Sequence, residues 1–384
     1  MSFSSPRYRW LKVTAIILGL AQLTGCAGFT SFSSSSKDDR DAAELAELFD
    51  DSDRAEDEAP VEDDSAAILE SVIEEVPESE EEAMLPLPVL DAPLTVYDWE
   101  VISGGMVGNK LSGITDSTFK RPVAVAARSE YVYVVDEGLD AVLRYDQATG
   151  RITEILDLKS AVTGEVADIY VDKDFSFYIT DTDGGRVLLY DRHGRLVRVF
   201  KDRFNLTKPV SVNVLDGGDV VVADGHFDHI LRFTNAGKLI AAYGGRGSDV
   251  AQFTNITAMA LGPDGFYVGA RVGRKVQVLS MDGHYAYSFG EGQVIFPAAI
   301  VVDSGNKSYV ADHMDHQIKV FDRGRLIATI GRAGSAPGQF MRVTDMWLDD
   351  TFLYIVDSLN ARIQVARLAP AGAPNDINFT PLFP

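Results

Sequence analysis

The chain has 384 residues, of which 57 are Asp or Glu and 35 are Lys or Arg, so its formal net charge is −22. A polyanion is repelled by phosphates at long range, which argues against nucleic acid as a partner. Cys26 is the only cysteine. An internal disulfide is therefore excluded, and stability must come from packing.

Residues 1–25 have the pattern of an export signal. Arg7, Arg9 and Lys12 precede an apolar run from Val13 to Leu23. This run is about half as long as the ~20 residues that a membrane-spanning helix needs, so a signal peptide is the better interpretation.

The sequence Leu-Thr-Gly-Cys at 23–26 resembles the lipobox of bacterial lipoproteins, in which the cysteine becomes the lipidated first residue. The resemblance implies that acyl chains on Cys26 anchor the protein to a membrane. Ala27, rather than Asp, follows the cysteine, which resembles the pattern for outer-membrane retention. We therefore expect an outer-membrane lipoprotein facing the periplasm or the cell surface. The alternative is an ordinary signal with a free, buried cysteine.

Residues 26–93 form a second segment that is first Ser-rich and then strongly acidic. Residues 37–93 contain 22 Asp or Glu against Lys37, Arg40 and Arg54, which accounts for −19 of the net charge. Dense charge of one sign with few aromatic residues predicts a disordered tether. Apolar residues at helical spacing within 43–49 and 66–76 indicate transient helices or, alternatively, short docking helices for a partner.

The rest of the chain is organised by a repeat. An apolar run, a short polar turn and a second alternating run recur six times. The first run ends at equivalent positions, at spacings of 45, 43, 46, 42 and 45 residues: Asp136, Asp181, Asp224, Ala270, Asp312 and Asp357. A period in the forties with several short β-rich runs per unit is typical of a propeller blade.

Each unit is predicted to form four antiparallel strands. In the third unit these are residues 210–215, 219–224, 229–233 and 239–244, separated by turns that contain Gly or Asn. The sixth unit offers only three good strands, and residues 96–102 supply one more before the first unit. We therefore expect residues 94–369 to form an all-β, six-bladed β-propeller. Its N-terminal strand should pair as the outermost strand of the last blade and close the ring.

Two stretches flank the units. Gly104 and Gly105, followed by Phe119 and Pro122, resemble an ordinary junction between two units. Residues 370–384 form a tail whose apolar side chains we expect to lie against the ring: Phe379, Leu382 and Phe383. A C-terminal peptide recognised by another protein is the alternative.

Three features of the repeat resemble the NHL family of six-bladed propellers. They are a Tyr-Val-x-Asp run, an Asp-Ser-x-Asn-x-Arg-Ile turn, found at 357–363, and a Phe at the start of the unit (Phe119, Phe253, Phe296 and Phe340). The resemblance covers residues 94–369 and implies the propeller architecture. It implies no single activity, because the family includes enzymes, nucleic-acid binders and protein-binding scaffolds.

The strand directions predict where cationic residues gather. In a four-stranded antiparallel blade, the turns between the second and third strands share one face with the loops between blades. This face is expected to collect Arg186, Arg246, Arg271, Arg274, Lys275, Arg332 and Arg362, and the opposite face several aspartates. An Arg-rich face is suited to anionic groups.

Some of these arginines have a structural alternative. Arg186 and Arg362 follow Asp181 and Asp357 by five residues, and an ion pair with that carboxylate would simply fix the turn. The fourth unit has Ala270 instead of Asp, so its cations lack this explanation and are better binding candidates. The predicted ligand-binding residues are Arg246, Arg271, Arg274, Lys275, Arg332, His226 and His313.

Four of the six histidines fall in two equivalent turns. They are candidate ligands for Zn or another divalent ion: His226, His229, His313 and His316. The resemblance implies metal-dependent chemistry as one option, because some NHL-like propellers are metal-dependent lyases and neighbouring six-bladed families are metal-dependent lactonases.

Two features oppose a catalytic metal. The two turns belong to units that are not adjacent, and the inner-strand positions from which those enzymes draw ligands are small or apolar in this chain: Ala124, Ser211, Ala258 and Ala299. Polar surface turns are the alternative interpretation, and the fold requires no cofactor.

The sequence contains neither a Gly-x-Ser-x-Gly elbow nor a cysteine nucleophile in the propeller. We therefore expect a non-catalytic binding or assembly module of a bacterial envelope complex, attached to the membrane through Cys26. Its partner would be a protein, peptide or glycan that docks on the Arg-rich face. The alternative is a metal-dependent hydrolase or lyase with the four histidines as ligands.

Overall fold

A computed structural model describes residues 94–109, 113–349 and 352–370. The predicted signal peptide (1–25), Cys26, the tether (26–93) and residues 371–384 of the predicted tail lie outside the described residues. In the part of the chain that is described, no helix is both long enough and apolar enough to cross a membrane.

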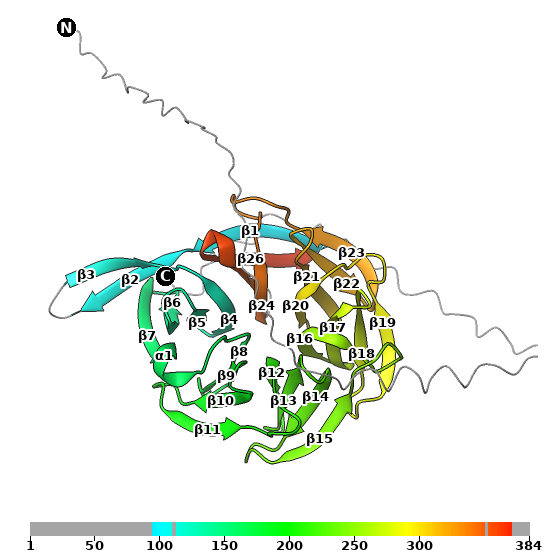
Figure 1. The fold of residues 1–384 in the computed structure, drawn as a ribbon. Coiled ribbons are helices and arrows are strands. Elements are labelled where there is room, and N and C mark those ends of the chain that lie inside the picture. Colours follow the sequence, from blue (N-terminus) through cyan, green and yellow to red (C-terminus); the bar gives the residue numbers. More distant parts are fainter. Residues whose placement is uncertain (1–93, 110–112, 350–351, 371–384) are drawn as a thin grey trace, which may run out of the picture. The chain divides into compact units, whose positions relative to one another are not determined.

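Six antiparallel sheets stand as blades around a common axis, which confirms the predicted six-bladed propeller (Figure 1). Blade 1 contains β4 (Pro122–Arg128), β5 (Tyr131–Asp136), β6 (Ala141–Asp146) and β7 (Arg151–Asp157). Blade 2 contains β8 (Ile169–Val171), β9 (Phe177–Asp181), β10 (Arg186–Tyr190) and β11 (Leu196–Phe200). Blade 3 contains β12 (Pro209–Val214), β13 (Val220–Asp224), β14 (His229–Phe233) and β15 (Leu239–Gly244), close to the ranges expected for the third unit.

The remaining blades follow the same order, with the first strand innermost. Blade 4 contains β16 (Thr254–Gly262), β17 (Gly265–Val272), β18 (Lys275–Leu279) and β19 (Tyr285–Phe289). Blade 5 contains β20 (Pro297–Val302), β21 (Lys307–Asp312), β22 (Gln317–Asp322) and β23 (Arg325–Ile330). Blade 6 contains β24 (Val343–Asp349), β25 (Phe352–Asp357), β26 (Arg362–Pro370) and β1 (Leu94–Ile102). The short helical elements are α1 (Leu158–Ala161) and a 3-10 turn, η2 (Ser358–Asn360).

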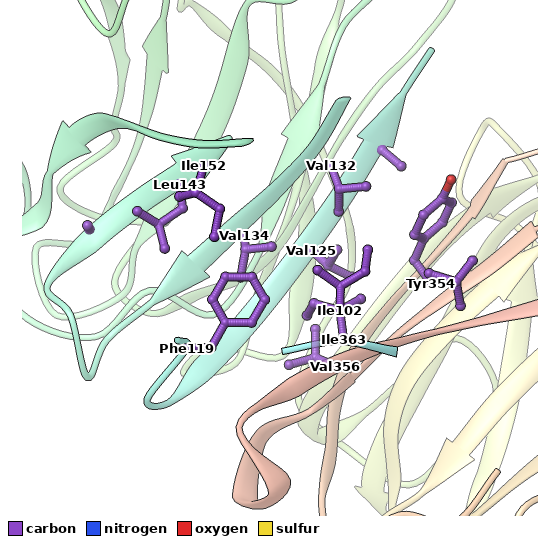
Figure 2. Packing of buried hydrophobic residues seen from close by; sticks show 13 residues of the cluster. Ile102, Phe119, Val125, Val132, Val134, Leu143, Ile152, Tyr354, Val356 and Ile363 are labelled. Atoms are coloured by element: carbon purple, nitrogen blue, oxygen red, sulfur yellow. The ribbon is translucent and has the colours of Figure 1, made fainter. Parts of the chain in front are cut away.

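Strand β1 closes the ring as predicted. It pairs antiparallel with β26, and the register ends with Ile102 opposite Ile363. Ile102 is buried and packs in a cluster that joins blade 6 to blade 1, where Phe119, Val125 and Val356 also lie (Figure 2). The first strand of the chain therefore contributes both backbone pairing and core packing to the last blade.

In the blades that have it, the repeated aspartate ties the blade to the loop that precedes it. Asp224 is fully buried, and its carboxylate accepts hydrogen bonds from the backbone N–H groups of Thr207, Lys208, His226 and Phe227, at distances between 2.6 and 2.9 Å. The first two donors lie in the inter-blade loop and the last two in the following turn. Asp136 of blade 1 and Asp312 of blade 5 likewise accept backbone hydrogen bonds from both the inter-blade loop and the following turn. Asp357 of blade 6 accepts one from the inter-blade loop.

The junction before blade 1 differs from the ordinary one expected from the sequence. It contains an additional hairpin, β2 (Gly104–Asn109) and β3 (Gly113–Thr118), which lies outside the ring beside β7 in Figure 1. The N–H of Met106 donates to the carbonyl of Gly150 at 2.9 Å. Strands β2 and β7 are joined by one parallel β-bridge, between Met106 and Arg151. Only glycine fits at position 105, because a Cβ atom there would lie 2.6 Å from the carbonyl oxygen of Gly150.

Candidate functional site

The turns between second and third strands and the loops between blades form one face of the ring, here called the upper face. Two predicted structural ion pairs are present on it. Arg186 Nε lies 2.7 Å from the buried Asp181 Oδ2, and Arg362 Nε lies 2.9 Å from the buried Asp357 Oδ2. These two arginines fix their own turns.

Arg246 has a similar structural contact. Its Nε lies 2.9 Å from Oδ2 of the buried Asp228, and its Nη2 donates to the carbonyl of His226. The other oxygen of Asp228 accepts from the N–H of Ile256 at 2.9 Å. Asp228 thus connects blade 3 to the first strand of blade 4, the blade in which Ala270 replaces the repeated aspartate, and it also holds Arg246 of the intervening loop.

The cations of blade 4 are different. Arg271 and Arg274 are exposed, and Lys275 is half-buried at the start of β18. Among the described residues, none of these three takes part in an ion pair within 4 Å. The Cζ atom of Arg271 lies 5.2 Å from the ring centroid of Phe296. Arg271 and Arg274 therefore present their charges to solvent, and the role of all three residues in binding stays a prediction.

Arg332 lies on the loop between blades 5 and 6 and is exposed. Its Nε and Nη2 atoms lie 3.1 Å from the side-chain amide of Gln339, whose oxygen accepts from both when it faces the guanidinium. No ion pair within the described ranges involves this arginine either.

The four turn histidines separate into two pairs. The Nε2 atom of His229 lies 2.6 Å from the carbonyl oxygen of Asn205, and the ring of His226 packs edge-on against Phe227. On blade 5 the rings of His313 and His316 have centroids 6.5 Å apart. Across the described residues, no group of three or more His, Cys, Asp or Glu side chains is arranged to hold a metal ion. The structure thus does not bring the four histidines together.

His313 lies at the mouth of an axial channel. Burial lowers its pKa, and the neighbouring side chains of Arg342, His316 and Arg271 lower it further, whereas Asp312 acts in the opposite direction. Its ring packs edge-on against Phe296, with centroids 5.3 Å apart. This histidine therefore sits in a positive environment.

Exposed apolar side chains also gather on the upper face. Each of blades 3 to 6 contributes one from its preceding inter-blade loop and one from its turn between second and third strands or, for Val272, from the strand end at that turn: Phe204, Phe227, Val250, Val272, Ile295, Met314, Met341 and Leu359. In the described part of the chain, blades 1 and 2 contribute no exposed large apolar residue to this face, but they do carry Glu137, Glu165 and Asp183. The apolar residues and the unpaired arginines thus share blades 3 to 6.

The innermost strands enclose the axial channel, which has a volume of about 490 Å³. Ala258 and Ala299 line it, together with Ser211, as the sequence indicated. The positions equivalent to these in blades 2 and 6 are Asp168 and Asp345, which also line the channel. These two carboxylates were not among the predicted site residues, although each lies 12 or 13 residues before the repeated position of its unit (Asp181 or Asp357), as the small residues do in theirs.

Both carboxylates are hydrogen-bonded across a blade boundary. Asp168 Oδ2 accepts from Ser211 Oγ and from the N–H of Val212, each at 2.8 Å. Asp345 Oδ2 accepts from the N–H of Val125 at 2.8 Å. Burial raises the pKa of Asp168 to about 6 against these hydrogen bonds. Burial first, and the nearby charge of Asp168 second, raise the pKa of Asp345 well above its usual range.

Comparison with known proteins supports the fold. A family model described as a 6-bladed beta-propeller matches residues 298–365. No curated protein sequence matches the chain.

Solved structures similar to this chain include two lyases. A streptogramin B lyase is 12% identical, with a TM-score of 0.51 over 72% of this chain and 98% of its own. A virginiamycin B lyase from Staphylococcus aureus is 11% identical, with a TM-score of 0.51 over 72% and 99%. A gluconolactonase from Xanthomonas campestris is 13% identical, with a TM-score of 0.50 over 73% and 99%. At such identities the likeness shows the fold alone, because propellers host many unrelated functions.

Proposed function

We propose that this chain is an NHL-type propeller of the bacterial envelope, anchored to the outer membrane through lipidated Cys26, that docks a protein or peptide on its upper face. The observation that supports this function is the shared location of eight exposed apolar side chains and the unpaired arginines on blades 3 to 6. Contiguous exposed apolar groups beside arginine are typical of protein-binding surfaces.

The chemistry of the face defines the partner. Arg271, Arg274 and Arg332 favour a segment that carries carboxylates. The apolar residues are mainly aliphatic, such as Val272, Met314 and Leu359, and they match aliphatic or aromatic side chains of a polypeptide better than the hydroxyl groups of a glycan. The partner is therefore an acidic, partly apolar protein segment.

Site-specific photo-crosslinking in cells tests this function. A photoreactive amino acid at Val272 or Leu359 should capture one and the same protein. Matched positions on the outer strand β11, Val197 and Leu196, are similarly exposed and should not capture it. A Cys26→Ser chain, which lacks the lipid attachment site, should leave the membrane fraction and lose the crosslink from Val272.

The decisive measurement is the affinity of the chain for the captured partner after that partner has been purified. Leu359→Asp places a charge in the proposed interface, and we expect it to weaken the affinity by about tenfold or more, the cost of removing one buried apolar contact. Leu196→Asp is the control and should change the affinity less than about twofold. Equal effects of the two substitutions would place the interface elsewhere and refute the proposal.

A metal-dependent hydrolase or lyase is the second candidate. The observation that favours it is the Nδ1 atom of His316, which is buried and has no hydrogen-bond partner among the described residues, beside the ring of His313. Elemental analysis of the protein purified without an affinity tag tests whether a metal is bound. A stoichiometric divalent metal that is lost on His313→Ala and His316→Ala substitution would support the second candidate, and its absence would leave the binding function.

A further inference from the structure

Four residues form a positive and aromatic cluster where the channel opens onto the upper face. Phe296, His313 and Arg342 line the channel, and Arg271 lies over the Phe296 ring at 5.2 Å. The N–H of His313 donates to the carbonyl of Phe296 at 2.9 Å, which fixes the histidine beside that ring. Residues from blades 4 and 5 and from the loop before blade 6 therefore meet at one point of the mouth.

The two guanidinium groups of this cluster are not neutralised within the described chain. Arg121, Arg186, Arg246, Lys319 and Arg362 have carboxylate partners on the same face, but no ion pair among the described residues includes Arg271 or Arg342. Both side chains are exposed, so they are available to a ligand. Two permanent positive charges that have no carboxylate partner create a potential that attracts an anionic group.

The interior of the channel limits how far an anion can enter. Asp345 on β24 follows Arg342, which immediately precedes that strand, by three residues, or about 10 Å of extended chain. Asp168 lines the same part of the channel, and a second carboxylate would be repelled there. An anionic group therefore stops at the mouth, beside Arg271 and Arg342.

We propose that the mouth of the channel is a carboxylate subsite, in which Arg271 and Arg342 bind a carboxylate of the docked polypeptide while Phe296 contacts the adjoining apolar group. This inference rests on the proposed function and names the part of the partner that reaches the axis. The carboxylate comes from a chain terminus or from an Asp or Glu side chain, and both present the same geometry to a guanidinium.

Small probes test the subsite without the partner. N-acetylphenylalanine carries a carboxylate next to an aromatic group, and N-acetylphenylalaninamide is the same molecule without the charge. We expect the acid to bind the full chain with a Kd of ~1 mM, the level that its size permits. The amide should bind at least about tenfold more weakly. N-acetylglutamic acid α-amide has its only carboxylate in the side chain. Comparing its affinity with that of N-acetylphenylalanine distinguishes a side-chain carboxylate from a chain-terminal one.

Nuclear magnetic resonance of labelled histidine gives the readout. Binding of the acid should shift the resonance of His313 and raise its pKa, because the anion offsets the positive charges around it. His284, in an exposed hairpin on the opposite face, should not respond. No response of His313 up to about 20 mM acid, or an equal response to the amide, would overturn the subsite.

Charge-matched variants separate a site from general attraction. Arg271→Gln with Arg342→Gln should weaken the acid at least about tenfold, whereas Arg323→Gln with Arg325→Gln, two exposed arginines of the opposite face, should leave it unchanged. Unfolding midpoints should be equal, because all four side chains are exposed. Equal weakening by both pairs would contradict the inference.

The partner assay keeps this inference separate from the proposed function. If Leu359→Asp weakens partner binding while the Arg271 and Arg342 pair has no effect, the docking function stands and the subsite is rejected. If Leu359→Asp has no effect, the docking function is rejected whatever the probes show.

Discussion

Asp224 shows how one side chain organises a blade. It accepts four backbone hydrogen bonds, two from the preceding loop and two from its own turn, while it is completely buried. Asp224→Ala leaves four N–H groups without their acceptor. Since each unsatisfied buried donor costs about 1 kcal/mol or more, we expect the free energy of unfolding to fall by about 3–5 kcal/mol.

Urea denaturation measures this loss. The control is Asp216→Ala, whose side chain is fully exposed on the opposite face and whose removal should change the unfolding free energy by less than ~0.5 kcal/mol. If the two variants are equally stable, the repeated aspartate has no structural role at this position.

Some side chains of the upper face and the channel could be predicted from sequence patterns, and others could not. The ion pairs of Arg186 and Arg362 were foreseeable, because a five-residue spacing across a tight turn places each guanidinium beside its aspartate. Asp168 and Asp345 were not recognised, because their neighbours in the sequence differ from those of Ala124 and Ala299. Only the register relative to the second strand shows that they occupy the same inner-strand position, from which Asp168, Asp345 and Ala299 line the channel.

At the scale of elements, β1 is the strand on which ring closure depends. Ile102 is 3% exposed within the cluster between blades 6 and 1, whereas Val101, its neighbour on the same strand, is 37% exposed. Ile102→Ala should lower the free energy of unfolding by about 2–4 kcal/mol, because it leaves a cavity where the ring closes. Val101→Ala is the matched control and should cost less than about 1 kcal/mol.

Thermal and urea unfolding of the two variants provide the measurement. Equal stabilities would mean that β1 adds backbone pairing but no packing to blade 6. A loss confined to Ile102→Ala would establish that the closing strand contributes to the shared core.

Strand β1 and the hairpin β2–β3 that follows it differ in how well the sequence predicts them. β1 was foreseeable because residues 96–102 are rich in β-forming apolar side chains and the sixth unit lacked an outer strand. The hairpin β2–β3 was not, because residues 104–118 are rich in Gly and small polar residues with weak strand propensity. Its contacts with Gly150 and Arg151 at the edge of β7 depend on the folded blade.

At the scale of the whole molecule, Asp168 and Asp345 connect blades around the axis. Asp168 of blade 2 bonds to Ser211 and Val212 of blade 3, and Asp345 of blade 6 bonds to Val125 of blade 1. The second of these contacts crosses the point where the ring closes. Both carboxyl groups are protonated more readily in the folded chain than in the unfolded chain, so the stability of the ring is linked to pH.

The sign of this linkage follows from the pKa of Asp168, which is about 6 in the folded chain against an ordinary value of 3.8. The folded chain therefore binds this proton more tightly than the unfolded chain does. The contribution of Asp168 to the free energy of unfolding rises as the pH falls from 7 towards 4, and it is lost as the pH rises through 6. A shift of about two units corresponds to at most roughly 3 kcal/mol.

Asp168→Asn removes the titrating group and should remove this part of the pH dependence. We expect the variant to be at least as stable as the parent at pH 7.5, where the buried charge is costly, and less stable at pH 4.5, where the parent carries the proton. Urea denaturation at several pH values between these limits measures the difference. Asp216→Asn, on the exposed opposite face, should give a difference that is independent of pH. Parallel stability curves for Asp168→Asn and the parent would show that this carboxyl group does not titrate between pH 4.5 and 7.5 in the folded ring.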